Sequence, residues 1–184
     1  MTGKQRQGSE KWRDVDAVVA AYAGTDAGLP AYLYAAEALR RALDARLWLL
    51  CPHDAQADWC NAEGTLVYPT PGRNGIDDGA AIDAQRAIDS LAACRAQAAF
   101  VLAEQGAAPY LPAYLCYLAG IPYRAGAEAE FAGAVLLPAV RLPVLCDDVE
   151  RHLALLAAVG VVPDDHRSRS ARPTKRNRSV ECEH

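Results

Sequence analysis

Two short polar loops carry the residues best suited to chemistry in this chain. The first loop, Gly24-Thr25-Asp26-Ala27-Gly28, follows an apolar run, and the carboxylate of Asp26 can act as a general base toward a hydroxyl group. Glycine lets the backbone approach a ligand, and the start of the helix after it favours anions. We take Asp26 as the candidate base and Gly28 as a candidate substrate contact. The alternative is that Asp26 is only a turn residue.

The second loop is Glu104-Gln105-Gly106, which directly follows the apolar run Ala98 to Ala103. Its carboxylate and amide groups can hydrogen-bond a sugar or another polar acceptor. Glu104 and Gln105 are therefore candidate substrate contacts, with a solvated strand end as the alternative. Arg124 stands in the next extended segment and is a candidate contact for an anionic group of the acceptor.

Several classes of site lack support in this sequence. There is no GxGxxG fingerprint, and Leu50-Cys51-Pro52 offers no acidic residue for a ribose, so no dinucleotide cofactor is expected. The cysteines form no CxxC pair, so no metal is expected. GxSxG, P-loop and HExxH motifs are also missing. The four histidines, residues 53, 152, 166 and 184, form no recognisable pair and are expected at the surface.

Apolar runs alternate with helical stretches along the chain, and this alternation positions the two loops. A parallel sheet between helices is expected, in a Rossmann-like three-layer sandwich of α/β class. Ligands of such sheets bind beyond the carboxyl ends of the strands, where both loops lie. Strands are predicted over residues 16–23, 46–51, 65–68, 98–103, 121–124 and 133–140, and helices over residues 30–45, 54–62, 77–94, 109–119 and 148–159.

Charge divides the 184 residues into three parts. Residues 14–162 are predicted to form one domain, and residues 14–165 carry nine arginines, no lysine and 20 acidic residues. So acidic a body is poorly suited to nucleic acid, and no nucleic-acid partner is expected. Residues 1–13 are expected to be a disordered leader and residues 163–184 a disordered basic tail. A nucleic-acid arm and the product of a frame change are the alternatives for the tail.

The cellular location follows from what the sequence lacks. No stretch approaches 18 uninterrupted apolar residues, and the polar, basic start of the chain is unlike a secretory signal. The six scattered cysteines are typical of buried free thiols in a reducing compartment. A cytoplasmic protein is therefore expected.

Three segments in this order resemble the N-terminal half of family 9 glycosyltransferases, the heptosyltransferase-like enzymes of GT-B architecture. The resemblance covers residue 16 to about residue 160 and is moderately specific in order and spacing. The family's Gly-Asp pair is not intact, because Leu29 follows Gly28, so the role of base passes to Asp26. The matching segments are Gly28-Leu-Pro…Ala38-Leu-Arg-Arg41, Phe100-Val-Leu…Tyr114-Leu-Cys-Tyr-Leu-Ala-Gly-Ile-Pro-Tyr-Arg-Ala-Gly126 and Asp148-Val-Glu-Arg-His-Leu-Ala-Leu-Leu-Ala-Ala-Val-Gly160.

The resemblance implies an acceptor-side domain for sugar transfer from a nucleotide-sugar to a lipopolysaccharide-type or other glycan acceptor, without a cofactor or a metal. In such enzymes the second half binds the nucleotide-sugar, so this chain, either truncated or completed by a separate half acting in trans, is expected to be inactive without a donor-binding half. The expected partners are thus a glycan or lipid-linked acceptor and that half. An uncovered apolar patch would also favour homo-oligomers. The alternative is a non-catalytic carbohydrate-binding or protein-interaction domain on the same fold.

Overall fold

The computed structural model describes residue 12 and residues 14–52, 61–69, 78–128, 135–143 and 147–161, with only the backbone described at residues 78–81. Within these ranges strands and helices alternate, as the sequence predicts. The strands are β1 (Ala17–Ala23), β2 (Arg46–Cys51), β3 (Gly64–Val67), β4 (Ala98–Ala103), β5 (Tyr123–Ala127) and β6 (Ala139–Val140). The helices are α2 (Leu29–Leu43), α3 (Asp78–Ala93), α4 (Tyr110–Leu118) and α5 (Asp148–Ala158), with the short 3₁₀ helix η1 (Asp26–Gly28) before α2.

The strands form one sheet in the order β3-β2-β1-β4-β5-β6, and each neighbouring pair is parallel. From β1 the chain moves outward through β2 to β3, then returns to the other side of β1 as β4. The strand order therefore reverses between β1 and β4, where open α/β sheets bind ligands. This topology confirms the predicted Rossmann-like fold.

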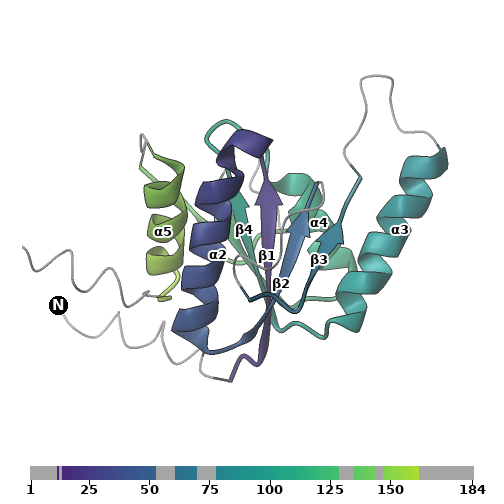
Figure 1. Cartoon of the computed structure of the whole chain (residues 1–184), viewed down its shortest axis with the longest axis horizontal. Helices are drawn as coiled ribbons and strands as arrows, with labels where there is room; N and C mark the ends of the chain where they lie inside the picture. The colour runs from purple at the N-terminus through teal and green to yellow at the C-terminus, as the bar shows by residue number, and fades with distance from the viewer. Residues whose placement is uncertain are drawn as a thin grey trace, which may run out of the picture.

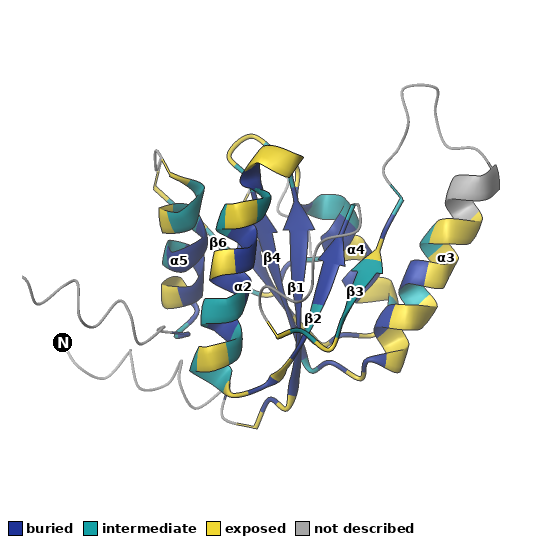
Figure 2. Cartoon of the chain, viewed as in Figure 1, coloured by how far each residue is buried: buried dark blue, intermediate teal, exposed yellow. Residues whose placement is uncertain are grey.

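Helices cover both faces of the sheet and give the molecule three layers (Figure 1). On one face, Val18, Ala20 and Tyr22 of β1 pack with residues of α2 and α5 in one core cluster. On the other, Ala17, Val19 and Ala21 pack with residues of α3 and α4 in a second cluster. Alternate residues thus enter opposite cores, which is why β1 and β4 are buried along their whole length (Figure 2).

Local sequence explains where the helices begin and end. Pro30 lies in the first turn of α2, where its missing N–H is not needed, and Asp44 ends that helix in the left-handed conformation at φ 50°. Asp147 caps α5, since its carboxylate accepts a hydrogen bond from the Val149 N–H at 2.8 Å. Predicted starts and ends differ from those observed by one to three residues for most elements.

Some predicted segments differ from the observed ones by more than three residues or lie outside the described ranges. The strand expected over residues 133–140 is reduced to Ala139–Val140, and residues 129–134 lie outside the described ranges. Most of the helix expected over residues 54–62 is also outside them, as are the tail from residue 162 and the leader except Trp12. Trp12 is buried, and its indole N–H donates to the Val159 carbonyl at 2.6 Å. Trp12 therefore packs against the domain, whereas the sequence predicts it as part of the disordered leader.

Cysteine burial agrees with the prediction at the three positions that the structure describes. Cys51, Cys94 and Cys116 are buried free thiols. Burial raises the pKa of Cys116 to about 12, so this thiol stays protonated and unreactive. Across the described ranges, none of the helices has the length and apolar character needed to cross a membrane.

Candidate functional site

An open pocket of about 640 Å³ lies at the carboxyl edge of the sheet. It is bordered by residues that follow β1, β2, β3 and β4 and by the first turn of α4, so it occupies the point where the strand order reverses. No arginine, lysine or histidine is found among its described lining residues. These are Ala23, Gly24, Thr25, Pro52, Tyr68, Glu104, Gln105, Gly106, Ala107, Ala108, Tyr110, Leu111 and Pro112.

Glu104 joins the two predicted loops directly. Its Oε1 accepts hydrogen bonds from the Tyr22 hydroxyl at 2.7 Å and from Thr25 Oγ1 at 3.1 Å. Its Oε2 accepts one from the Thr25 backbone N–H at 3.0 Å. The Tyr22 hydroxyl also lies 2.6 Å from the Thr25 carbonyl, and its single proton favours the charged carboxylate. The side chain of Glu104 thus fixes the loop after β1.

Gly24 and Gly28 make room for this carboxylate. A methyl group at Gly28 would overlap Glu104 Oε1, and one at Gly24 would lie 2.6 Å from the Glu104 Cδ. Gly28 is buried, and its N–H donates to the Thr25 carbonyl at 3.2 Å. The predicted role of Gly28 was close approach of the backbone to a ligand. The structure shows close approach to a side chain of the protein itself.

The hydrogen bonds also set the ionisation of this group. Burial raises the pKa of Glu104, but the hydrogen bonds from Tyr22 and Thr25 and the Gly28 backbone outweigh it and hold the pKa below its usual range. Burial and the neighbouring Glu104 carboxylate raise the pKa of Tyr22 far above its usual value. Near neutral pH, therefore, Glu104 is ionised and Tyr22 is a hydrogen-bond donor.

The other two loop residues lie near this cluster. Asp26 begins η1, is exposed and follows Thr25 directly, but it is not among the residues that line the pocket. Gln105 is exposed and lines the pocket, while its backbone N–H donates to the Asp148 carboxylate at 3.1 Å. The start of α5 is thus tied to the rim of the site. Gln105 thus lines the pocket with its amide side chain, and Asp26 is an exposed residue directly after the lining residue Thr25.

Arg124 is not brought together with these residues. It pairs in register with Ala99, near the start of β4, which places it roughly 16 Å from the carboxyl edge. Its side chain is 5 % exposed and donates to the carbonyls of Ile121, Pro122 (3.1 Å) and Val135 (2.7 Å). The guanidinium is therefore engaged by the backbone at the opposite edge of the sheet, apart from the pocket.

His152 is buried, although the sequence predicts all four histidines at the surface. Its side chain is 1 % exposed, between α5 and the neighbouring backbone of Ala31 and Ala103. Neither ring nitrogen makes a well-formed hydrogen bond within the described residues. Burial lowers the pKa of His152, so the ring is neutral at pH 7. The other three histidines lie outside the described ranges.

Two tyrosines of the site were missed from the sequence. The sequence predicts Tyr22 within a buried apolar strand, yet its hydroxyl is central to the cluster around Glu104. Tyr68 lines the pocket and donates to the Tyr22 carbonyl at 2.8 Å. A usable signal was present, because a tyrosine inside a buried strand needs a hydrogen-bond partner for its hydroxyl group.

Comparison with known proteins supports a relationship of fold. No protein-family model matches the chain, and a search of curated proteins finds no match. A solved structure, the glycosyl transferase family 9 protein from Veillonella parvula DSM 2008, matches 82 % of this chain with a TM-score of 0.51 and 11 % sequence identity. The match covers 42 % of that protein, so this chain spans less than half of its length. At this identity, the likeness is one of fold.

Proposed function

We propose that the chain provides the acceptor-binding half of a glycosyltransferase with GT-B architecture. The observation that carries the proposal is the match in fold to a family 9 glycosyl transferase over 42 % of that protein. The pocket at the carboxyl edge, where β1 and β4 diverge, gives this half a place for an acceptor. The proposed acceptor is a glycan, of the lipopolysaccharide type or another, with a reacting hydroxyl group.

Glu104 and Asp26 have different roles in this proposal. Glu104 holds the loop after β1 and has a lowered pKa, so removing a proton from an acceptor would cost it its hydrogen bonds. Asp26 is exposed at the rim of the same loop. We assign general-base catalysis to Asp26, which would take the proton of the acceptor hydroxyl as that oxygen attacks the anomeric carbon of the donor and displaces its nucleoside diphosphate.

The remaining parts of the site position the acceptor. Gln105 can donate to and accept from sugar hydroxyls through its amide group, and it lines the pocket. Tyr68 and Tyr110 offer apolar ring surface in the same lining. Binding and orienting a nucleotide-sugar is assigned to a separate donor-binding half. Without that half, the two reactants are not held together and transfer is not expected.

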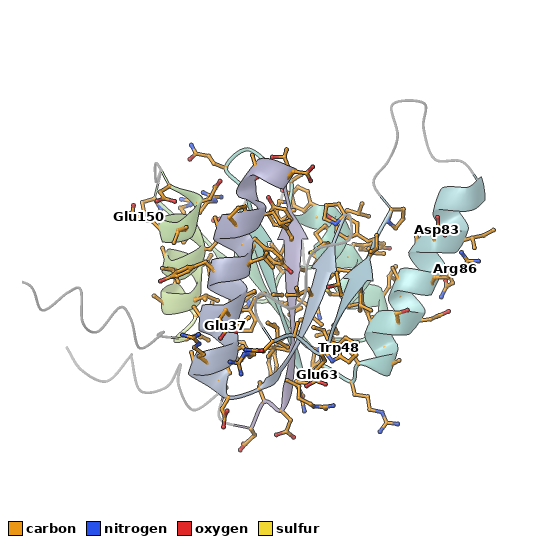
Figure 3. The ribbon with its side chains drawn as sticks, in the orientation of Figure 1. Glu37, Trp48, Glu63, Asp83, Arg86 and Glu150 are labelled. Atoms are coloured by element: carbon orange, nitrogen blue, oxygen red, sulfur yellow. The ribbon has the colours of Figure 1, made fainter. Side chains whose placement is uncertain are left out.

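The test combines the chain with a donor-binding half in trans. Calorimetry should detect no binding of an ADP-sugar or UDP-sugar to this chain alone, and transfer to a glycan acceptor should occur only in the combined sample. Asp26→Asn should then lower the transfer rate by about 10²-fold or more, since it removes the base. Asp83→Asn is the matched control, because Asp83 is an exposed residue of α3 that pairs with Arg86 and is not among the residues that line the pocket (Figure 3).

Three outcomes would count against this proposal. Micromolar binding of a nucleotide-sugar to the chain alone would contradict the assignment of the two halves. Full transfer by Asp26→Asn would remove Asp26 from the mechanism. Acceptor binding without transfer in any combination would favour a non-catalytic carbohydrate-binding domain instead.

A further inference from the structure

The loop between β1 and α2 is the part of this fold that offers backbone N–H groups to an anion. It joins the carboxyl end of a central strand to a helix of 15 residues, and it contains two glycines. In related α/β folds, phosphate groups of ligands bind at this turn, because the N–H groups and the helix dipole favour negative charge. In this chain a negative charge is already present there, and the protein itself supplies it.

The Glu104 carboxylate occupies this place. Its Oε2 lies 3.0 Å from the Thr25 N–H, and its Oε1 receives the hydroxyl groups of Tyr22 and Thr25 at 2.7 and 3.1 Å. Backbone and hydroxyl donors around a carboxylate are the partners that a phosphate oxygen would also seek. Glu104 enters from the end of β4, so this contact joins residues 79 positions apart in the sequence.

The glycines show that the space is shaped around this internal anion. A Cβ at Gly28 would overlap the carboxylate, and a Cβ at Gly24 would press on its Cδ and on the Tyr22 hydroxyl. The space that glycine leaves open at this turn is therefore filled by Glu104. A ligand phosphate could enter only if the Glu104 side chain left.

The charge of the residues that line the neighbouring pocket also disfavours an anionic ligand. Its described lining contains no cationic side chain, and Glu104 is its ionised group. An anionic group placed there would meet this carboxylate at short range with no cationic side chain in the described lining, which is unfavourable in a partly buried site. Hydroxyl groups carry no such penalty, since Gln105 and backbone groups of the lining can bind them.

We propose that the β1–α2 loop is an anion-binding turn that the chain fills with its own Glu104 carboxylate, so that the adjoining pocket accepts uncharged groups and rejects phosphate. Glu104 then acts as a specificity-determining residue. The proposal does not depend on sugar transfer, because it concerns what the loop binds in this chain alone. A failed transfer assay would therefore leave it standing.

The experiment removes the Glu104 carboxylate by mutation and supplies a replacement anion from solution. In Glu104→Ala, the Thr25 N–H and the hydroxyl groups of Tyr22 and Thr25 lose their carboxylate, and acetate or inorganic phosphate can replace it. We expect the Tm of this variant to rise by about 3–6 °C at an anion concentration ten times the dissociation constant, relative to sodium chloride of equal ionic strength. The Tm of the wild-type protein and of Tyr22→Phe, which keeps the charge, should show no such anion-specific rise.

A second measurement covers the case in which Glu104→Ala does not fold. Glu104→Gln keeps the size of the side chain and loses the charge, so the amide hydrogen of Thr25 should exchange at least about tenfold faster, while amides within β1 keep their protection. In wild-type protein, titration with inorganic phosphate should leave the amide resonances of Thr25 and Gly28 unshifted. A phosphate-dependent shift of these resonances would overturn the proposal. So would a folded Glu104→Ala variant that responds to acetate and phosphate only as it does to chloride.

Discussion

Two charged side chains, at opposite edges of the same sheet, are held by hydrogen bonds in the same way. At the amino edge, the Arg124 guanidinium donates to backbone carbonyls before β5 and β6. At the carboxyl edge, the Glu104 carboxylate accepts from a backbone N–H and two hydroxyl groups after β1. In both, a charged side chain takes up main-chain groups that the ends of the strands leave unpaired.

The two charged groups have different surroundings: the guanidinium is enclosed by the protein, and the carboxylate lies beside a pocket. Arg124 is 5 % exposed, with its cation 5.1 Å from the ring centre of Tyr117, and it is not among the residues that line the pocket. Glu104 is only partly buried and lies beside a pocket of about 640 Å³. The same kind of contact is thus enclosed at one edge of the sheet and lies beside a pocket at the other.

The largest effect is expected from breaking the Arg124 cluster. Arg124→Met keeps the apolar stem and leaves buried carbonyls without a donor, so the free energy of unfolding should fall by about 3 kcal/mol, as measured by urea denaturation. Arg141→Met is the matched control, since Arg141 is 87 % exposed and pairs with Glu128 at the surface. Its effect should stay within about 0.5 kcal/mol. Equal effects of the two variants would contradict the structural role of Arg124.

A smaller loss is expected from crowding the Glu104 carboxylate. Gly28→Ala places a methyl group on Glu104 Oε1, so the carboxylate or the loop must move, at a cost of about 2 kcal/mol in the free energy of unfolding. Gly106→Ala is the comparison, because no atom lies within 4 Å of its added Cβ and only its φ of +85° is strained. That strain should cost about 1 kcal/mol. Equal losses would show that the carboxylate does not restrict residue 28.

The pH dependence of stability should separate Glu104 from His152. Both pKa values are lowered in the folded protein, so the unfolded state binds protons more readily in both cases and stability falls as pH falls. The His152 contribution is lost below its ordinary pKa of 6.5, and the Glu104 contribution below 4.5. Urea denaturation from pH 8 to pH 3 should show both steps. His152→Leu should remove the upper step alone, and Glu104→Gln the lower one; any other assignment would contradict the structure.

The smallest effect is expected from Tyr22→Phe. It removes one hydrogen bond to Glu104 while keeping the ring that stacks on Tyr32 at 4.7 Å, so the free energy of unfolding should fall by about 1 kcal/mol. The pKa of Glu104 should rise toward its usual value, because this hydrogen bond lowers it. NMR titration of the carboxyl carbon measures that change. An unchanged pKa would show that Tyr22 does not donate to Glu104.

Much of the fold could be predicted from the sequence. The apolar run Ala98–Ala103 and the run Arg46–Cys51 are strands with the predicted bounds, because a strand buried on both faces must be apolar throughout. The helix stripe formed by Leu33, Ala36 and Leu39 is buried, as its spacing predicts. Chain order and the polarity of parallel strands also placed both polar loops at one edge, although their catalytic and binding roles stay predictions.

The contacts between these two loops are determined by the tertiary structure. Nothing in the sequence near Gly28 shows that its missing side chain makes room for Glu104, because the two residues meet only when β4 is inserted beside β1. The sequence likewise predicts His152 at the surface and Arg124 as a contact for an anionic acceptor group, yet both are buried by the packing around them. Local sequence determined which residues form strands and loops. The three-dimensional packing decided which polar groups became partners, because hydrogen bonds depend on distances in space rather than along the chain.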